Sequence, residues 1–193
     1  YAGRLMNHSA DSLFRHRIEL IPNCGHSIDY SLTTPWLKTY KRNPYPHTFM
    51  WEDYPMDGQR RQGFYNLYVM KRPKAADGLK DASGEDRDYY EMDIQDNVIR
   101  LSVKKVTYQT LERDPVYGID LKFTKSYHPV IGGKWKIYLN DQLVDMNRPV
   151  AVFINDRKVF EGKLVPRMED MITSCMEYFD PCRVFPASVD VAL

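Results

Sequence analysis

The stretch VIRLSVKKV, residues 98–106, decides the fold class of this chain. Apolar and polar residues alternate along it, with Ile99, Leu101 and Val103 in one set and Arg100, Ser102 and Lys104 in the other. A period of two is typical of a β-strand, because successive side chains point to opposite faces of the sheet. We therefore predict a strand that turns one face to a hydrophobic core and the other to water.

Similar runs continue from residue 48 to the end of the chain. They are FMWEDY (49–54), GFYNLYVMK (63–71), GIDLKF (118–123), KWKIYL (134–139), PVAVFI (149–154), KVFEGKL (158–164) and ASVDVAL (187–193). The NDRK segment at 155–158 is a predicted hairpin turn, since Asn and Asp tolerate left-handed backbone angles. Residues 47–193 are therefore predicted to form a mainly β domain, an antiparallel β-sandwich-like fold.

Two segments interrupt these strands. Behind Pro166, apolar residues recur at helical spacing up to Phe179, which predicts one packed helix that buries Met171, Ile172 and Cys175. By contrast, residues 73–88 contain almost no large apolar side chain to offset the entropy of ordering, which predicts a mobile loop.

The first 46 residues have a different pattern. Apolar spacing predicts a helix over residues 2–14, then a short strand over 17–21, then a turn that presents His26. A second helix is expected to start with Thr34 as its N-cap and to stop before Pro44. This part is therefore predicted to be a helix-strand-helix segment, separate from the β domain.

Composition excludes some classes of partner. The 193 residues include 27 Lys and Arg and 26 Asp and Glu, and no long block of one sign suits a nucleic-acid backbone. The sequence contains no run of about 18 apolar residues, which is the length needed to span a bilayer. Cys24, Cys175 and Cys182 form no Cys-x-x-Cys pair, and no other metal-ligand or cofactor motif is present, so we expect neither a metal nor a cofactor.

His26 has two interpretations from the residues alone. The sequence has no G-x-S-x-G elbow, P-loop, G-x-G-x-x-G or H-E-x-x-H motif. Ser27 and Asp29 flank His26, but sequence neighbours cannot reach opposite nitrogens of one imidazole, so they do not complete a local triad. His26 is thus either a turn residue or a catalytic histidine whose partners lie elsewhere.

Five aromatic residues in the first strands also have two interpretations. They are Trp51, Tyr54, Phe64, Tyr65 and Tyr68. Aromatic residues on alternating strands usually pack the core of a sandwich, which is the interpretation we prefer, whereas a sugar-binding platform is the alternative.

Several segments carry a resemblance to a known family: IELIPNCGHSIDY (18–30), WLKTYKRNPYP (36–46), FMWEDY, FYNLYV and residues 139–164. They resemble secreted α/β-hydrolases of the prolyl-oligopeptidase and polyhydroxybutyrate-depolymerase-like type with a β-rich C-terminal extension. In that family a Gly-His pair supplies the catalytic base, and an Arg-Asn-Pro-x-Pro segment leads to the extension. Gly25 with His26, and residues 42–46, match these two elements.

The resemblance implies that residues 1–46 are the end of an α/β-hydrolase domain and that His26 is the base of a Ser-His-acid triad. It implies a periplasmic or secreted location. The family's serine and acid precede the point where this sequence begins, so we expect the 193 residues to be an inactive C-terminal fragment of a serine hydrolase that acts on an ester or peptide substrate. The alternative is a non-catalytic β-sandwich module that binds carbohydrate or protein. The resemblance also places the strand at 17–21 at the edge of a parallel sheet whose other strands are missing, so we expect it to pair with a second copy or with the β domain.

Overall fold

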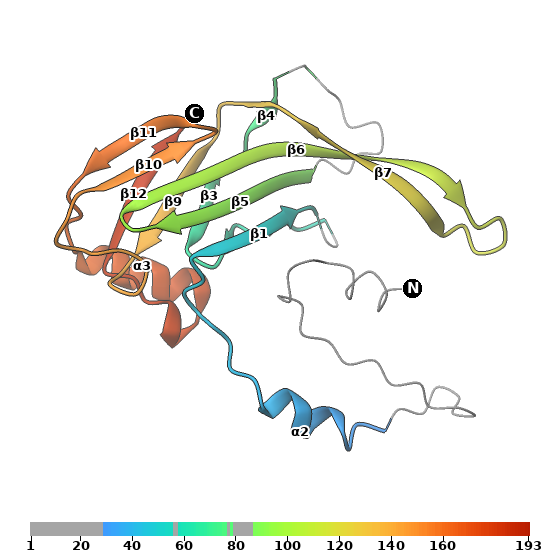
Figure 1. Ribbon diagram of the computed structural model, residues 1–193, viewed down its shortest axis with the longest axis horizontal. Helices are drawn as coiled ribbons and strands as arrows, with labels where there is room; N and C mark the ends of the chain where they lie inside the picture. Colours follow the sequence, from blue (N-terminus) through green and yellow to red (C-terminus); the bar gives the residue numbers. More distant parts are fainter. Residues whose placement is uncertain (1–28, 56–57, 77, 79–86) are drawn as a thin grey trace. The chain divides into compact units, whose positions relative to one another are not determined.

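A computed structural model of the chain describes residues 29–55, 58–76, 78 and 87–193 (Figure 1). The chain divides into two compact units, residues 1–42 and residues 43–193. The helix predicted over 2–14, the strand predicted over 17–21 and His26 lie outside the described residues, so these predictions stay open.

The predicted second helix is present as α2, Thr33–Lys38. It starts earlier than expected, with Leu32 at the cap, because the Tyr30 carbonyl already accepts the N–H of Thr33 (3.1 Å). The predicted N-cap, Thr34, is therefore inside the helix. The ring of Trp36 packs edge-on against Tyr40 one turn later, with ring centroids 5.1 Å apart.

The larger sheet of the β unit has six strands. Its order is β1–β5–β6–β10–β11, and β7 also pairs with β6. The strands are β1 (Thr48–Asp53), β5 (Arg87–Gln95), β6 (Val98–Arg113), β7 (Asp120–His128), β10 (Val150–Ile154) and β11 (Arg157–Gly162). All pairs are antiparallel except β6 with β10, which run parallel, so the sheet is mixed and not purely antiparallel.

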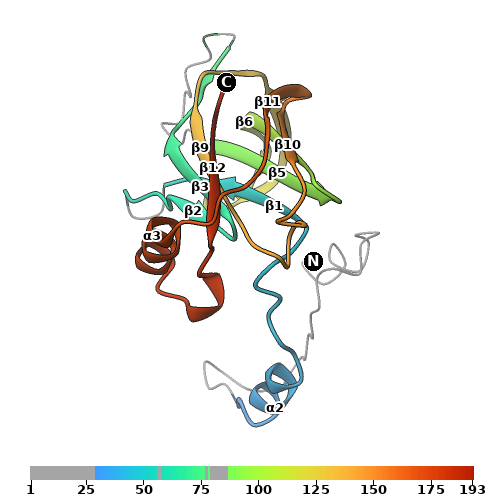
Figure 2. The same cartoon turned by 90° about the vertical axis from the view of Figure 1, so that its left-hand side faces the viewer.

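The smaller sheet has four strands and lies opposite the first, as the two layers in Figure 2 show. Its order is β12–β9–β3–β2, with the bounds β2 (Gly63–Phe64), β3 (Leu67–Lys71), β9 (Lys134–Leu139) and β12 (Ala187–Ala192). Side chains from both sheets form one hydrophobic core. The prediction of a mainly β chain is therefore confirmed.

The expected alternation of buried and exposed residues is confirmed in β6 and β9. Ile99, Leu101 and Val103 are buried in the core, while Arg100 is exposed. Trp135, Ile137 and Leu139 are likewise fully buried. The pattern of period two thus identified the inward face of both sheets.

The loop prediction for residues 73–88 is wrong at both ends. Lys74–Ala75 form β4, which pairs with β8 (Val130–Ile131). Arg87 already begins β5, where it lies opposite Val106. Backbone pairing, which needs no large side chain, orders these ends, and positions 77 and 79–86 lie outside the described residues.

The helix α3, Met168–Tyr178, lies where it was predicted but buries the opposite face. Ile172 is 54% exposed, and Met171 and Cys175 are also exposed, so the predicted burial of these three residues is wrong. The buried residues are Asp170 and Ser174.

Hydrogen bonds explain this inversion of α3. Ser174 Oγ accepts the backbone N–H of Phe185 (3.0 Å), and Asp170 Oδ1 accepts the hydroxyl of Ser188 (2.8 Å). The helix is thus joined to the segment around β12 by polar contacts, and its Met and Ile side chains are left facing water, while Tyr178 at its end packs on Phe185.

Candidate functional site

The predicted catalytic residue, His26, lies outside the described residues, so its surroundings stay a prediction. Two other histidines are described. Nε2 of His47 lies 2.9 Å from the carbonyl oxygen of Gln142, and Nε2 of His128 lies 2.9 Å from Oγ1 of Thr107. These contacts join strands and loops of the β unit.

Within the described ranges, no group of three or more His, Cys, Asp or Glu residues is placed to hold a metal ion. Cys175 and Cys182 are free, exposed thiols. None of the helices in the same ranges is long and apolar enough to cross a bilayer.

A hollow of the β unit arises where β6 changes partner along one edge. Residues 98–101 of β6 pair with β10, and residues 105–113 pair with β7. Both partners lie on the edge opposite β5, since Val106 pairs with β5 on one side and with β7 on the other. None of the strands in the described residues pairs with 102–104 on that edge, so β10 and β7 leave a gap there.

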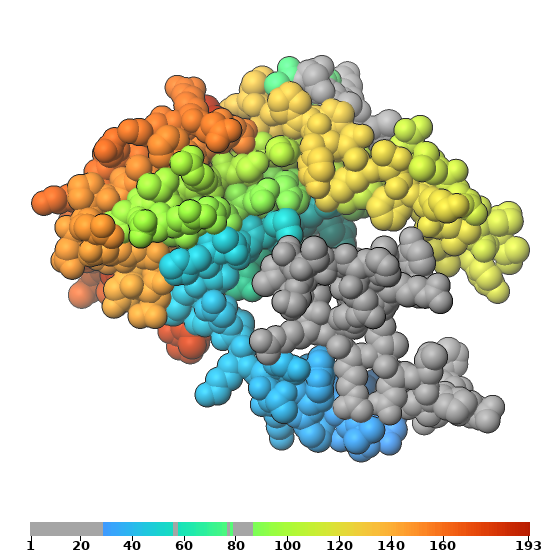
Figure 3. All heavy atoms as spheres, viewed as in Figure 1, coloured from blue at the N-terminus to red at the C-terminus, as the bar shows by residue number. Residues whose placement is uncertain are grey.

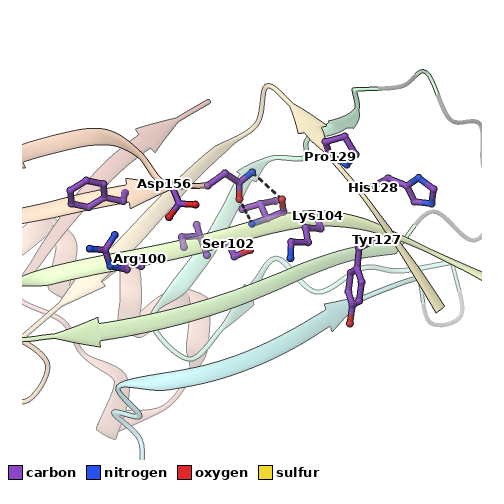
Figure 4. Close-up of a pocket in the computed structure, with 11 residues that line it drawn as sticks. Arg100, Ser102, Lys104, Tyr127, His128, Pro129 and Asp156 are labelled. Atoms are coloured by element: carbon purple, nitrogen blue, oxygen red, sulfur yellow. Dashed lines mark hydrogen bonds between the residues drawn. The ribbon is translucent and has the colours of Figure 1, made fainter.

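The side chain of Asn155 closes the backbone part of this gap. Its Oδ1 accepts the N–H of Val103 (2.8 Å), and its Nδ2 donates to the carbonyl of Val103 (3.1 Å), as the dashed lines in Figure 4 mark. Asn155 and Asp156 form the β10–β11 turn, with φ of 47° and 64°, so the predicted NDRK hairpin is confirmed. The side-chain amide of Asn155 thus bonds the backbone groups of Val103 as a neighbouring strand would, and the space above it stays open.

That space is a cleft of about 520 Å³ on the outer face of the large sheet (Figure 4). Its lining consists of Arg100, Leu101, Ser102, Val103, Lys104, Tyr127, His128, Pro129, Phe153, Asn155 and Asp156. The Arg100 guanidinium lies 4.8 Å from the centre of the Phe153 ring, and Lys104 Nζ lies 5.3 Å from that of Tyr127. The cleft therefore combines two cations, one carboxylate and two aromatic rings.

A polar cluster adjoins the cleft on the same face, and we call it the Glu52 cluster. The Glu52 carboxylate accepts hydrogen bonds from Lys125 Nζ (2.6 Å), the Tyr108 hydroxyl (2.8 Å) and Arg87 Nη1 (3.2 Å). Burial opposes ionisation of Glu52, but these donors outweigh it, so the pKa of Glu52 is lowered from its ordinary value. Glu52 is therefore a stable anion that fixes two cations on the sheet surface.

Aromatic rings connect the Glu52 cluster with the cleft. The Arg87 guanidinium lies 4.7 Å from the ring centres of both Tyr54 and Tyr108. Lys125 Nζ lies 5.1 Å from the centre of the Tyr127 ring, which also lines the cleft. Such an arrangement of rings, cations and hydroxyl groups suits non-covalent binding of a polar ligand, by stacking and hydrogen bonding.

The preferred interpretation of the early aromatic residues, core packing, is confirmed for four of them. Trp51 is buried and stacks on Phe64, with ring centroids 5.4 Å apart. Tyr65 and Tyr68 also pack against the core, whereas Tyr54 is exposed. A sugar platform made of all five is therefore excluded.

A buried ion cluster lies on the inner face of the large sheet, where β1 and β5 pair. Asp53 and Asp88 are opposite each other in the register and almost fully buried. Arg72 Nη1 contacts both carboxylates, and Lys105 Nζ lies 2.6 Å from Asp88 Oδ1. Arg60 lies 3.7 Å from Asp53. We call these five residues the ion cluster.

The two carboxylates of the ion cluster neutralise neighbouring cations and join β1, β5, β6 and the segment after β3. Burial raises the pKa of the Asp53 carboxyl, an effect that Arg72 and Arg60 offset only in part. The paired charges leave no group suited to attack a substrate, so we assign this cluster a structural role.

Sequence reasoning did not find the cleft, although it placed Arg100, Ser102 and Lys104 on the water-facing side of their strand. The cleft depends on which strands pair with β6, and the pairing with β10 joins residues that lie far apart in the sequence. The turn residues at 155–156 were the one local signal, because they identified a hairpin whose first side chain turns back onto β6.

Comparison with known proteins gave no match to any protein-family profile, to any curated protein or to any solved structure.

Proposed function

We propose that this chain is the C-terminal part of a serine hydrolase that acts on an ester or peptide, with residues 43–193 as its β-rich extension. The observation that carries the proposal is an order in the sequence: the Gly25-His26 pair, then the segment at 42–46, then the β unit. His26 is proposed as the residue that takes the serine proton and returns it to the leaving group. Secretion or export to a periplasm is part of the same proposal.

The local structure of the segment at 42–46 supports its role as an entry into the extension. Asn43 Oδ1 accepts the backbone N–H of Tyr45 (3.0 Å), which bends the chain between Pro44 and Pro46. The Tyr45 ring then packs on Phe185 in the core of the β unit, with ring centroids 5.9 Å apart. The residues of this segment therefore anchor the start of the β unit.

The test uses the product of the whole coding sequence, including any part upstream of Tyr1. His26→Ala should lower kcat for an activated ester by about 10⁴-fold or more, as loss of a triad histidine does. His47→Ala is the matched control and should leave kcat unchanged, because His47 is exposed, lies in the β unit and does not line the cleft. The 193-residue chain should hydrolyse the ester no faster than free imidazole does.

Two results would count against the hydrolase proposal. One is near-normal turnover in the His26→Ala protein. The other is the absence of labelling by a fluorophosphonate, which reacts with an activated serine. Either result would leave His26 as a turn residue.

A second candidate function is a non-catalytic module that binds carbohydrate, and the cleft with the Glu52 cluster favours it. Apolar faces of sugar rings pack on aromatic side chains, and sugar hydroxyls suit the donors and acceptors around Tyr127 and Arg100. Affinity electrophoresis with a panel of soluble polysaccharides should then show retardation that Tyr127→Ala removes. Tyr117→Ala is the matched control, because Tyr117 is exposed and does not line the cleft. Equal retardation of both variants would exclude the cleft as the binding site.

A further inference from the structure

Residues 107–128, the outer part of β6 and the whole of β7 with the connecting turn, form a two-stranded arm that extends beyond the other strands (Figures 1 and 3). Seven large side chains of the arm are between 46% and 78% exposed: Leu111, Val116, Tyr117, Ile119, Leu121, Phe123 and Tyr127. Single exposed apolar residues are common, but this many on one two-stranded arm mark an interaction surface.

Charges on the arm are compensated within the chain. Residues 107–128 contain three cations and three carboxylates, so their net charge is zero with neutral His128. The ion pairs are Arg113–Asp120 (2.8 Å), Lys122–Glu112 (2.7 Å) and Lys125–Glu52 (2.6 Å). Asp114, the remaining carboxylate, accepts the N–H groups of Val116 and Tyr117. Asp114 is the one charge of the arm for which the described residues give hydrogen bonds and no ion pair, so an identical arm can approach this one with little repulsion between like charges.

The arm also has an open backbone edge. β7 pairs with β6, and none of the strands in the described part of the chain pairs with its other edge. An open edge of this kind presents free N–H and C=O groups to a further strand. About a two-fold axis normal to the sheet, β7 of one copy can pair antiparallel with β7 of a second copy.

In that pairing, side chains of the same parity from both copies share one face. Leu121, Phe123 and Tyr127 have the same parity along β7, so the two copies place these side chains in one stripe across the joined edges. Lys125 has the same parity and lies within the stripe, where its charge is paired with Glu52. A charged partner would make few favourable contacts with this stripe, whereas a second arm brings matching apolar side chains beside it.

The exposed area is sufficient for a stable pair. A fully buried aromatic side chain covers about 150–250 Å², so each half-exposed residue of the arm offers on the order of 100 Å². Leu111 lies on β6, away from the free edge, so six such residues on each of two copies offer at most about 1,200 Å², which exceeds the ~1,000 Å² that a specific interface needs.

We infer that two copies of this chain associate through their arms, with the free edges of β7 paired. This interface is separate from the pairing expected of the strand at 17–21, and it does not depend on whether the chain belongs to a hydrolase. The second copy comes to lie beside Tyr127, at the mouth of the cleft.

The experiment measures the mass of the whole 193-residue chain by analytical ultracentrifugation as a function of concentration. The wild-type chain should approach twice 22.7 kDa. A double variant, Leu121→Lys with Phe123→Lys, should raise the dissociation constant of the dimer by about 100-fold or more. It places charges at two positions that are exposed in the single chain and that the dimer interface would cover. Met176→Lys in α3 is the matched control, since Met176 is 65% exposed but lies outside the arm, and it should leave the constant unchanged.

Circular dichroism and thermal melting should show that all variants fold as the wild type does, because every changed side chain is exposed. A wild-type chain that is a monomer at all concentrations would overturn the inference. So would dimers that persist in the arm variant, since the interface would then lie elsewhere, and so would a dimer that Met176→Lys dissolves equally well.

Discussion

Loss of one carboxylate from the ion cluster should destabilise the β unit more than loss of any surface charge. Asp88 is fully buried, and its oxygens lie 2.9 Å from Arg72 Nη1 and 2.6 Å from Lys105 Nζ. Asp88→Asn keeps the shape but removes one of the two carboxylates that the three cations contact. Breaking a buried pair in this way costs about 3–5 kcal/mol, because Lys105 stays buried and loses its ion pair with Asp88.

This cost is a large part of the total stability of a domain, which is about 5–15 kcal/mol. For a unit of this size, 1 kcal/mol shifts the melting temperature by roughly 2–4 °C, so Asp88→Asn should lower it by about 6–20 °C. Urea denaturation followed by tryptophan fluorescence measures the same loss as a shift of the midpoint at constant slope.

The control for Asp88→Asn is Asp190→Asn. Asp190 pairs with Lys136 at 2.8 Å, but its side chain is 40% exposed, so its loss should cost at most about 1 kcal/mol. A second variant, Asp88→Asn with Lys105→Met, removes the stranded cation and should recover part of the loss. If Asp88→Asn costs no more than Asp190→Asn, solvent screens the ion cluster and our reasoning about its burial is refuted.

Three further changes have defined outcomes. Asn155→Ala should cost about 2–3 kcal/mol in a thermal melt, because the gap on β6 loses both side-chain hydrogen bonds and Ala is strained at positive φ. Gly133→Ala should cost about 3 kcal/mol in urea, since φ is 107° and a Cβ would collide with the Trp135 ring, whereas Gly132→Ala, with φ of 64° and open space, should cost about 1 kcal/mol. The lowered pKa of Glu52 stabilises the fold above the ordinary value of 4.5, and this contribution is lost as the pH falls below it, so Glu52→Gln should destabilise at neutral pH and flatten the acid dependence of the melting temperature.

The strands could be predicted from the sequence because each one meets the core along a whole face. Three successive inward positions of β6 are apolar and buried, so the alternation would remain recognisable even if one of them were polar. They are Ile99, Leu101 and Val103. The order of the strands could not be predicted in this way. The parallel pairing of β6 with β10 brings together residues that lie about fifty positions apart, and no local pattern records it.

The inversion of α3 shows where a hydrophobic pattern gives the wrong face. The spacing of its Met and Ile residues indicated a helix, and the helix is there. Its orientation depends on Asp170 and Ser174, which find hydrogen-bond partners around β12 that the helix sequence does not contain. A short helix buries little apolar area, so a few well-placed polar contacts are sufficient to determine which side faces the sheet.

The ion cluster, in contrast, left a signal in the sequence. In the first strand Phe49, Trp51 and Asp53 share one parity, so an acid stands where the alternation requires an inward residue. Asp88 interrupts the inward set of β5 in the same way. An isolated charge at an inward position is costly unless an opposite charge meets it, so two such acids require buried cations nearby.

Lys105 fulfils that requirement, because it follows Leu101 and Val103 at the inward parity of β6. The three breaks in alternation occur on three strands, and those strands are neighbours in the order β1–β5–β6. Opposite charges at inward positions therefore carried information about which strands pair, which the apolar residues, all alike in their preference for the core, could not supply. Charged exceptions to a strand pattern are thus the positions from which strand order can be inferred, provided that their signs are compared.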